Sequence, residues 1–319
     1  MSANINTVMY VGEKPWHGLG KRLEKAATAE EAIKAASLDW EVSKEPIFLN
    51  KGSAPILKHH AIVRKDQNIP LGIVGDRYVP LQNRSAFSFF DAVVGIKEAI
   101  YHTAGALGQG EIIWILAKLN GVIRVVGQDI TEKFLLLTNR HDGGGSVQIL
   151  WTPIRVVCQN TLNVALEGTG QSLHTYLRHT ANLGLKVEQV RQALGVISAK
   201  SEIFESAAKR LAAVQATPAL LKEYLERLGL APKAEGSEAV RSHAQSVMEE
   251  VSGLFEYGRG NEMAGVKGTL WAGFNAVAEY ADYYRSPKAS PENRAKSLLF
   301  GSGADLKRRA WKEALTLAR

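Results

Sequence analysis

The sequence contains little cysteine and no long apolar run, and each absence removes a class of protein. The one cysteine among 319 residues cannot form an internal disulfide, which excludes a fold held together by disulfide bonds. The longest apolar runs, such as residues 112–117, are far shorter than the roughly 18 residues of a membrane-spanning helix. The first residues lack the basic start and apolar stretch of a signal peptide. We therefore expect a soluble, cytoplasmic protein that does not associate with membranes.

Positive charge is in excess, and it is distributed unevenly. The chain has 39 Lys and Arg against 32 Asp and Glu, a net charge of +7. Residues 285–319 alone hold nine basic and three acidic residues, so this segment carries a net charge of +6. A basic excess indicates an acidic partner, of which nucleic acid is the commonest. Two interpretations stay open: a solvated basic tail, or an arm that contacts phosphates. The candidate contacts in the arm are Lys307, Arg308, Arg309 and Lys312.

Hydrophobic periodicity divides the chain into a β-rich part and a helical part. Short β-type runs, bounded by Pro and Gly, are predicted at 40–49, 60–64, 71–74, 99–107, 111–119, 133–139 and 146–151. Helices are predicted at 26–37, 82–94, 154–166, 186–216, 218–228, 241–255, 268–284 and 304–318. Hairpins followed by segregated helices favour an α+β fold. We expect a β-rich, antiparallel domain over residues 1–168 and a helical domain with a basic C-terminal segment over 169–319.

Motifs for catalysis or for cofactor binding are weak. Cys158 lies in an apolar context, which is typical of an inert buried thiol. The adjacent His59 and His60 would point to opposite faces of a strand. The segment 260–269 resembles a P-loop, but one residue separates Gly265 from Lys267, and a helical pattern precedes it. We expect no enzyme activity, no cofactor and no metal, although a metal-dependent nuclease with scattered carboxylates stays an open alternative.

Basic and amide residues surround the last predicted hairpin. The candidate phosphate contacts are Lys133, Arg140, His141 and Arg155, with Arg124 as a further candidate before the hairpin. Glycines 143–145 would let the backbone approach a phosphate closely. Gln159 and Asn160, on the predicted helix 154–166, are candidates for contact with sugar or base edges. The competing interpretation is that these groups cap turns or bond within the fold.

Aromatic residues offer a second set of candidates. Trp114 and Trp151 either stack on bases or belong to the core. Tyr257 and Arg259 lie in a second basic and aromatic cluster, which continues to Lys267 as a further candidate DNA contact. After it, Trp271, Asn275 and Glu279 follow one another at helical spacing, which is typical of a structural face or of a site.

Several of these motifs together resemble a known family. They are 16–20 (WHGLG), 155–162 (RVVCQNTL), 268–271 (GTLW) with 275–280, and 301–303 (GSG) with Lys307. They resemble a family of uncharacterised phage- and plasmid-encoded proteins, best known as a domain of unknown function on mobile elements. The resemblance implies a mobile-element protein that acts in a bacterial cytoplasm.

A more distant resemblance concerns the order of elements alone. Two hairpins followed by a helix are similar to the core of Rad- and phage Erf-type single-strand annealing proteins. That resemblance implies rings that hold single-stranded DNA in a basic groove without ATP, and it is an analogy of fold.

Two functional hypotheses of different classes follow. The first is an ATP-independent single-stranded DNA-binding and annealing protein of recombination or replication, which acts as a homo-oligomeric ring or filament. The second is a protein-interaction module of the mobile element, an anti-defence or assembly factor that binds a host or phage protein through helices 186–228.

Overall fold

The structure is a computed structural model, and it describes most of the chain. The described residues are 8–11, 20–24, 28–50, 53–88, 99–157, 160–161, 174–181, 195–232, 237–285, 293–294, 297–298 and 301–319. The chain forms two compact units. The first unit comprises Met1–Asn120, Phe134–Trp151 and Leu173–Ile197, and the second comprises Gly121–Lys133, Thr152–Ser172 and Ser198–Arg319. The predicted domains 1–168 and 169–319 are continuous stretches, whereas these units are interleaved along the chain.

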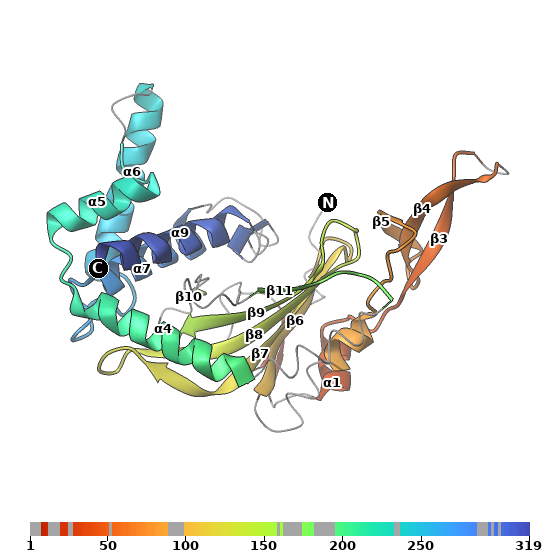
Figure 1. The fold of residues 1–319 in the computed structure, drawn as a ribbon, viewed down its shortest axis with the longest axis horizontal. Helices are drawn as coiled ribbons and strands as arrows, with labels where there is room; N and C mark the ends of the chain where they lie inside the picture. Colours follow the sequence, from red (N-terminus) through yellow and green to blue (C-terminus); the bar gives the residue numbers. More distant parts are fainter. Residues whose placement is uncertain are drawn as a thin grey trace. The chain divides into compact units, whose positions relative to one another are not determined.

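Two β-sheets and a set of later helices give the α+β fold expected from the sequence (Figure 1). The larger sheet has the strand order β10-β9-β8-β7-β6-β1-β2, and β11 also pairs with β9. Its strands are β1 (Val8–Val11), β2 (Lys21–Leu23), β6 (Ala99–Leu107), β7 (Ile112–Arg124), β8 (Ile130–Arg140), β9 (Val147–Arg155), β10 (Asn160–Thr161) and β11 (His174–Leu177). The predicted hairpins β6–β7 and β8–β9 are confirmed, since each pair lies side by side.

The first unit also holds the smaller sheet and a short helix. The smaller sheet has the antiparallel order β3-β4-β5, formed by β3 (Val42–Phe48), β4 (Pro55–Arg64) and β5 (Ile69–Gly75). Helix α1 (Ala29–Ala35) lies within the helix predicted over 26–37, and its N-cap is Thr28, whose side chain accepts from the backbone of Glu31 in a capping box. Trp114 and Trp151 are almost fully buried, so the structure decides between the two interpretations of these residues in favour of the core.

The second unit contains the later helices. They are α5 (Pro218–Leu228), α6 (Glu238–Tyr257), α7 (Leu270–Glu279), the π-helix η2 (Tyr280–Tyr284) and α9 (Ser302–Leu317), and most of α4 (Gly195–Ala213). Every residue of α7 is buried. An aromatic cluster of Phe204, Trp271, Phe274 and Trp311 joins α4, α7 and α9, and the rings of Phe204 and Trp311 stack at 5.2 Å. This cluster is the core of the helical unit.

The helix predicted over 154–166 is wrong for its described residues. Ile154 and Arg155 continue strand β9, and residues 160–161 form the short strand β10 beside them. Pro153 fits in the strand because it lies between the residues that pair with β11 and those that pair with β10. The β-branched residues around it also favour an extended chain. Cys158, Gln159 and residues 162–166 lie outside the described residues, and of Asn160 only the backbone is described.

Candidate nucleic-acid interface

Arg155, a predicted phosphate contact, is fully buried in the second unit. Its Nε donates to Oδ1 of Asp129 at 2.8 Å, in an ion pair without solvent exposure. Its terminal nitrogens donate to the backbone oxygens of Arg259 and Gly260 and to the side-chain oxygen of Asn261. A guanidinium with these bonds has little left to offer a phosphate. The structure therefore gives Arg155 a structural role, that of holding the loop that follows α6.

Hydrogen bonds of two further side chains, Trp271 and Asn261, hold the same region in place. Trp271 donates from its indole nitrogen to the other oxygen of Asp129 at 2.6 Å. Asn261 donates to the backbone oxygens of Leu254 and Ala272, at the end of α6 and the start of α7. These bonds satisfy a buried charge pair and tie strand β9 to two helices, as buried polar networks must. Trp271, Asn275 and Glu279 are all buried, so the predicted face of α7 is a structural one.

The side chain of Arg259 points away from this network and lies over an aromatic ring. Its guanidinium carbon is 5.0 Å from the centre of the Tyr283 ring, a cation–π contact. Two exposed tyrosines flank the pair in sequence: Tyr257, which is 76% exposed, and Tyr284, which is 41% exposed. Arg285 is exposed beside Tyr284. We call these five residues the Tyr–Arg patch.

The wide turn of η2 carries two of the three tyrosines of this patch, Tyr283 and Tyr284. The amide of Arg285 donates to the carbonyl of Tyr280, five residues earlier, so the turn holds one residue more than an α-helical turn. Asp282 in the same turn is buried, whereas Tyr284 and Arg285 are exposed. Such π-turns occur frequently at functional sites.

A buried carboxylate holds Arg259 in place. Oε2 of Glu279 accepts from the backbone amide of Arg259 at 3.0 Å, and Oε1 is 3.9 Å from the Arg259 Nε. Burial raises the pKa of Glu279, and the hydrogen bond and the charge of Arg259 oppose that rise. The arrangement orients a partly exposed guanidinium between two ordered groups, Glu279 and Tyr283, without burying it.

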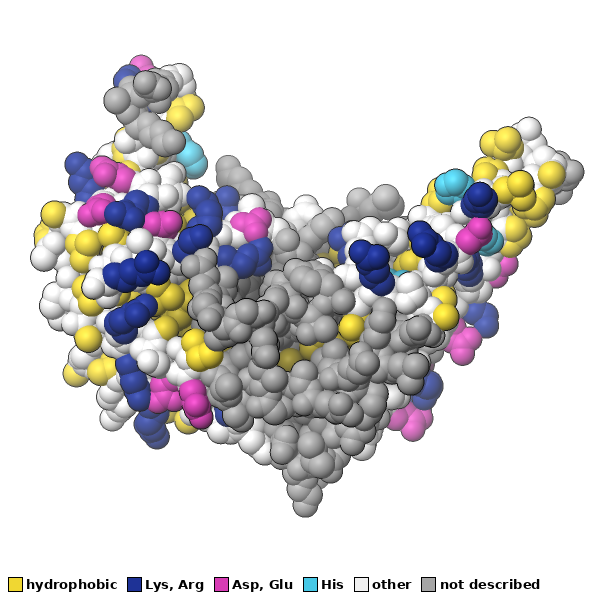
Figure 2. All heavy atoms as spheres, in the orientation of Figure 1, with side chains coloured by type: hydrophobic (Ala, Val, Ile, Leu, Met, Phe, Trp, Pro, Cys, Tyr) yellow, Lys and Arg dark blue, Asp and Glu magenta, His cyan; other side chains and the backbone are white. Residues whose placement is uncertain are grey.

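The predicted basic arm is a packed helix. Lys307 is fully buried and pairs with Asp282, so it cannot reach a phosphate in this conformation. Arg308 pairs with Asp305 on the same helix, and Arg309 donates to the carbonyl of Leu228, at the end of α5. Arg309 and Lys312 are exposed. Figure 2 shows Lys and Arg side chains spread over the helices of this unit, with Asp and Glu among them.

The predicted phosphate contacts Arg140 and His141, on the β8–β9 hairpin, form their bonds within the first unit. Arg140 is half-buried and pairs with Asp142, and His141 is fully buried with its Nε2 2.9 Å from Oδ1 of Asn83. The glycines of the turn meet protein atoms: a Cβ at Gly143 would lie 3.1 Å from the carbonyl oxygen of Ile73. Their small size therefore serves packing against β5 and against the Arg140 side chain.

The remaining predicted DNA contacts, Lys133, Arg124 and Lys267, do not form one continuous basic surface. The amide of Val125 donates to the carbonyl of Asp129, which sets the β7–β8 register and places Lys133 opposite Gly121. Arg124 is three residues from Gly121, so it lies on the other face of this hairpin from Lys133. Lys267 is exposed on the loop before α7. The structure thus brings none of these three into a common groove.

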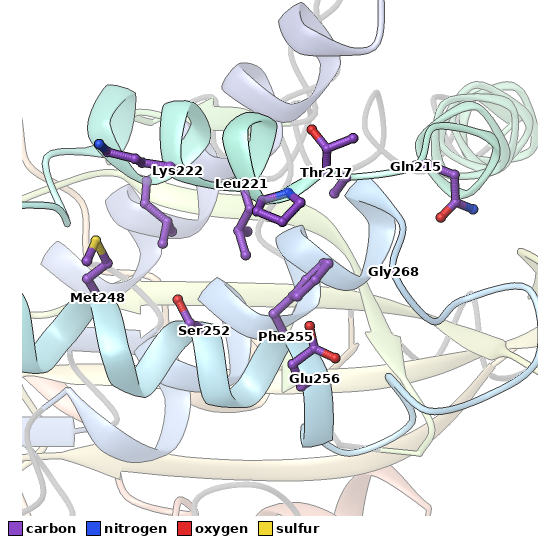
Figure 3. Close-up of a pocket in the computed structure, with 12 residues that line it drawn as sticks. Gln215, Thr217, Leu221, Lys222, Met248, Ser252, Phe255, Glu256 and Gly268 are labelled. Carbon is purple, nitrogen blue, oxygen red and sulfur yellow. The ribbon is translucent and has the colours of Figure 1, made fainter.

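A pocket of about 520 Å³ lies between α5 and α6 in the second unit (Figure 3). Its walls are mainly apolar and include Leu221 and Leu225 of α5 and Met248 and Phe255 of α6. Leu221 and Phe255 point toward each other across it, and Lys222 lies at the edge. Apolar lining with few polar groups is suited to an apolar side chain or a small apolar ligand.

Other kinds of site find little support in the described residues. Among them, no three His, Cys, Asp or Glu side chains come together as metal ligands. No helix in the described part of the chain is long and apolar enough to cross a membrane.

Sequence reasoning found two of the five residues of the Tyr–Arg patch as a cluster. It singled out Tyr257 and Arg259 as a basic and aromatic cluster, but it did not join them to Tyr284 and Arg285. The available signal was the run Tyr283-Tyr284-Arg285 at the end of a predominantly apolar helical pattern.

Comparison with known proteins identifies a family whose description names no activity. The model of the domain of unknown function DUF932 matches residues 70–311. No curated protein and no solved structure matches the chain.

Proposed function

The chain belongs to the DUF932 family, whose description assigns no activity, and we propose that it binds single-stranded DNA and anneals complementary strands without ATP. The observation that carries the proposal is the Tyr–Arg patch, in which Arg259 lies over the ring of Tyr283 and exposed tyrosines flank the pair in sequence. Proteins that bind single strands without sequence preference combine aromatic platforms for the bases with cations for the backbone.

Stacking on the tyrosines would supply the affinity that is independent of salt. A base that stacks on an aromatic side chain contributes about 1–3 kcal/mol. Tyr257 and Tyr284 are exposed in the free protein, so a base could cover them without displacing any part of the fold. The buried network of Arg155 and Asp129 holds the loop that follows Tyr257, which lowers the entropy cost of ordering that loop on binding.

Phosphates would be bound by the arginines of the patch and by α9. Arg285 donates to the carbonyl of Ser302, the first residue of α9, so the patch adjoins the start of that helix. Arg308, Arg309 and Lys312 follow within three turns and offer a path for the backbone of the strand. In this proposal a phage or plasmid encodes the protein, which acts in the bacterial cytoplasm, as the motif resemblance implies.

Oligonucleotide binding across a salt series tests the proposal. We expect wild-type affinity to fall with salt, with log K decreasing by about 0.7 per phosphate neutralised. Tyr284→Ala should weaken binding roughly 5- to 150-fold, as expected for the loss of one stacked base, with an unchanged salt slope. Tyr284→Phe keeps the ring and should bind as wild type.

Arg259→Ala should lower both the affinity and the salt slope, and Arg241→Ala, an exposed arginine on α6 outside the patch, is its matched control. Absence of binding at low salt, or full binding by a Tyr257→Ala/Tyr284→Ala variant, would overturn the proposal. Annealing is measured separately, as the rate at which complementary labelled strands pair without ATP. If the protein binds single strands but does not accelerate their pairing, the annealing part of the proposal is wrong and only the DNA-binding part stands.

A second function is favoured by a separate feature of the first unit. The β3–β4–β5 sheet exposes Phe48, Leu49, Leu57 and Ile73, with Leu57 80% exposed. Figure 2 shows apolar side chains gathered toward the end of the β3–β4 hairpin. Exposed apolar patches commonly mark sites of protein interaction. A protein-interaction module would bind a host or phage protein stoichiometrically, lose it in Leu57→Asp, and show no affinity for oligonucleotides.

A further inference from the structure

Glu279 is a buried carboxylate that lies beside the exposed cation of the Tyr–Arg patch. Its side chain is 3% exposed, whereas the side chain of Arg259 is 59% exposed. Oε1 of Glu279 is 3.9 Å from the Arg259 Nε, which is too far for a hydrogen bond. Among the described residues, the Arg259 guanidinium contacts this carboxylate and the Tyr283 ring but has no hydrogen-bond acceptor. Its N–H groups are therefore available to an incoming phosphate.

The charged groups that act on Glu279 come from three other segments. Arg259 follows α6, Arg155 belongs to β9, and Asp282 belongs to η2, where it is paired with Lys307 of α9. Burial raises the pKa of the Glu279 carboxyl above its ordinary value of 4.5. The hydrogen bond from the Arg259 amide and the charges of the two arginines oppose this rise in pKa, and Asp282 adds to it. Glu279 therefore depends on the charge of Arg259 to stay ionised.

A phosphate that binds Arg259 approaches the same guanidinium that Glu279 faces. Two anions then share one cation, and water cannot screen the buried carboxylate. We propose, on the basis of the function proposed for the patch, that Glu279 takes up a proton from solvent when a phosphate of a single strand binds Arg259. The proton goes to Oε1, since Oε2 accepts from the Arg259 amide at 3.0 Å. The patch thus binds DNA more tightly as the pH falls.

The direction of this pH dependence follows from the number of bound protons. The complex holds up to one proton more than the free protein and the free strand, so lowering the pH favours the complex. Affinity rises as the pH falls through the range between the pKa of Glu279 in the free protein and its higher pKa in the complex. Well above that range Glu279 is ionised in both states, and it adds no further pH dependence.

Oligonucleotide affinity of the full chain at pH 8 and pH 5.5 tests the inference. Glu279→Gln keeps an oxygen acceptor for the Arg259 amide but removes the charge. We expect it to bind about 5-fold or more tightly than wild type at pH 8, and this advantage should shrink at pH 5.5. Groups that titrate elsewhere, such as the exposed His243, affect both proteins alike. Glu262→Gln removes an exposed carboxylate of the same loop and should keep the wild-type pH dependence.

Proton uptake on binding separates this role of Glu279 from a structural one. Calorimetric titration in buffers of different ionisation enthalpy, at about pH 6, measures the protons taken up. We expect wild type to take up more protons than Glu279→Gln or Arg259→Ala, and packing alone would not produce this difference. Circular dichroism at each pH checks that the variants are folded.

The outcomes distinguish this inference from the function on which it rests. Wild type that binds the strand without taking up protons would contradict the inference and leave DNA binding intact. Equal affinities of wild type and folded Glu279→Gln at pH 8 would do the same. Absence of binding by wild type at both pH values would overturn the proposed function, and the inference with it.

Discussion

Nζ of Lys307 lies 2.6 Å from Oδ1 of Asp282, and neither side chain is exposed to solvent. The pair joins α9 to the π-helix η2, which carries Tyr283 and Tyr284 of the Tyr–Arg patch. Burial lowers the pKa of Lys307, and the neighbouring Asp282 carboxylate opposes that shift. A lysine that the charge count marked as a DNA contact is therefore part of the support for the neighbouring surface.

Removing Lys307 should destabilise the second unit. Lys307→Met leaves the Asp282 carboxylate buried without its lysine, and we expect a loss of about 3–5 kcal/mol in the free energy of unfolding. Lys307→Met/Asp282→Leu removes both charges and should recover most of that loss. Lys312→Met, on the exposed side of the same helix, should change stability by less than about 0.5 kcal/mol.

Urea unfolding measures all three variants. If the double variant is as unstable as the single one, the cost comes from packing at position 307 and not from an uncompensated charge.

Deleting residues 304–319 should unfold the helical unit, so such a deletion would not isolate the contribution of the basic segment to DNA binding. The deletion removes Trp311, whose ring stacks on Phe204 and meets Phe274 at 5.1 Å. It also removes the Ala310 carbonyl that accepts from the buried hydroxyl of Tyr224. Loss of one buried Trp costs about 3–5 kcal/mol on its own.

Far-UV circular dichroism and limited proteolysis should report a loss of helix well beyond the deleted segment. A truncated chain that retains a protease-resistant helical unit would contradict this expectation. Removal of Arg319 alone is the control, since it is exposed at the end of the chain.

Gly260→Ala should lower the free energy of unfolding by more than Gly229→Ala does. Both glycines have positive φ, +74° and +70°, so each substitution pays about 1 kcal/mol for the left-handed backbone. A Cβ at Gly229 meets nothing within 4 Å, whereas at Gly260 it would clash with Val157 and approach the Arg155 guanidinium at 3.1 Å. The clash adds about 1–3 kcal/mol. Equal free energies of unfolding for the two variants would show that the loop moves freely around Arg155.

Stability should fall as the pH falls below about 6.5, because of two buried histidines. Burial lowers the pKa of His141 to about 3 and that of His102 to about 4. In the unfolded chain both histidines take up protons below about 6.5, and in the folded chain they stay neutral until the pH nears these lower values. Their contribution is fully present above pH 6.5 and is lost progressively as the pH falls toward 3.

His141→Gln removes the larger of the two contributions. Between pH 7 and pH 5 the wild-type free energy of unfolding should fall by about 2 kcal/mol per buried histidine, and the variant should lose about 2 kcal/mol less than wild type. Urea unfolding at the two pH values measures the difference. An equal fall in both proteins would mean that His141 is protonated in the folded state.

The fold was predictable wherever local chemistry and final environment agree. The capping box at Thr28, the two hairpins and helix α5 follow from residues within a few positions of one another. The helix predicted after Pro153 failed because a proline there suits either a first helical turn or an unpaired strand position. Pairing with distant strands decided in favour of the strand.

The candidate site was less predictable, because charge in a sequence does not report burial. Arg155 and Lys307 carry the same formal charge as Arg259 and Lys312, yet the first two are buried in ion pairs and the last two are exposed. Their partners, Asp129 and Asp282, are 26 and 25 residues away in sequence. No spacing rule connects residues that far apart.

The sequence by itself determined the α+β class, the order of the elements, the position of most helices and the excess of positive charge, because these depend on local periodicity and composition. The tertiary structure alone decided which cations are exposed, and that a π-turn brings Tyr283 to Arg259. These features depend on which distant segments pack together, since packing decides whether a charged side chain is buried in an ion pair or exposed on the surface.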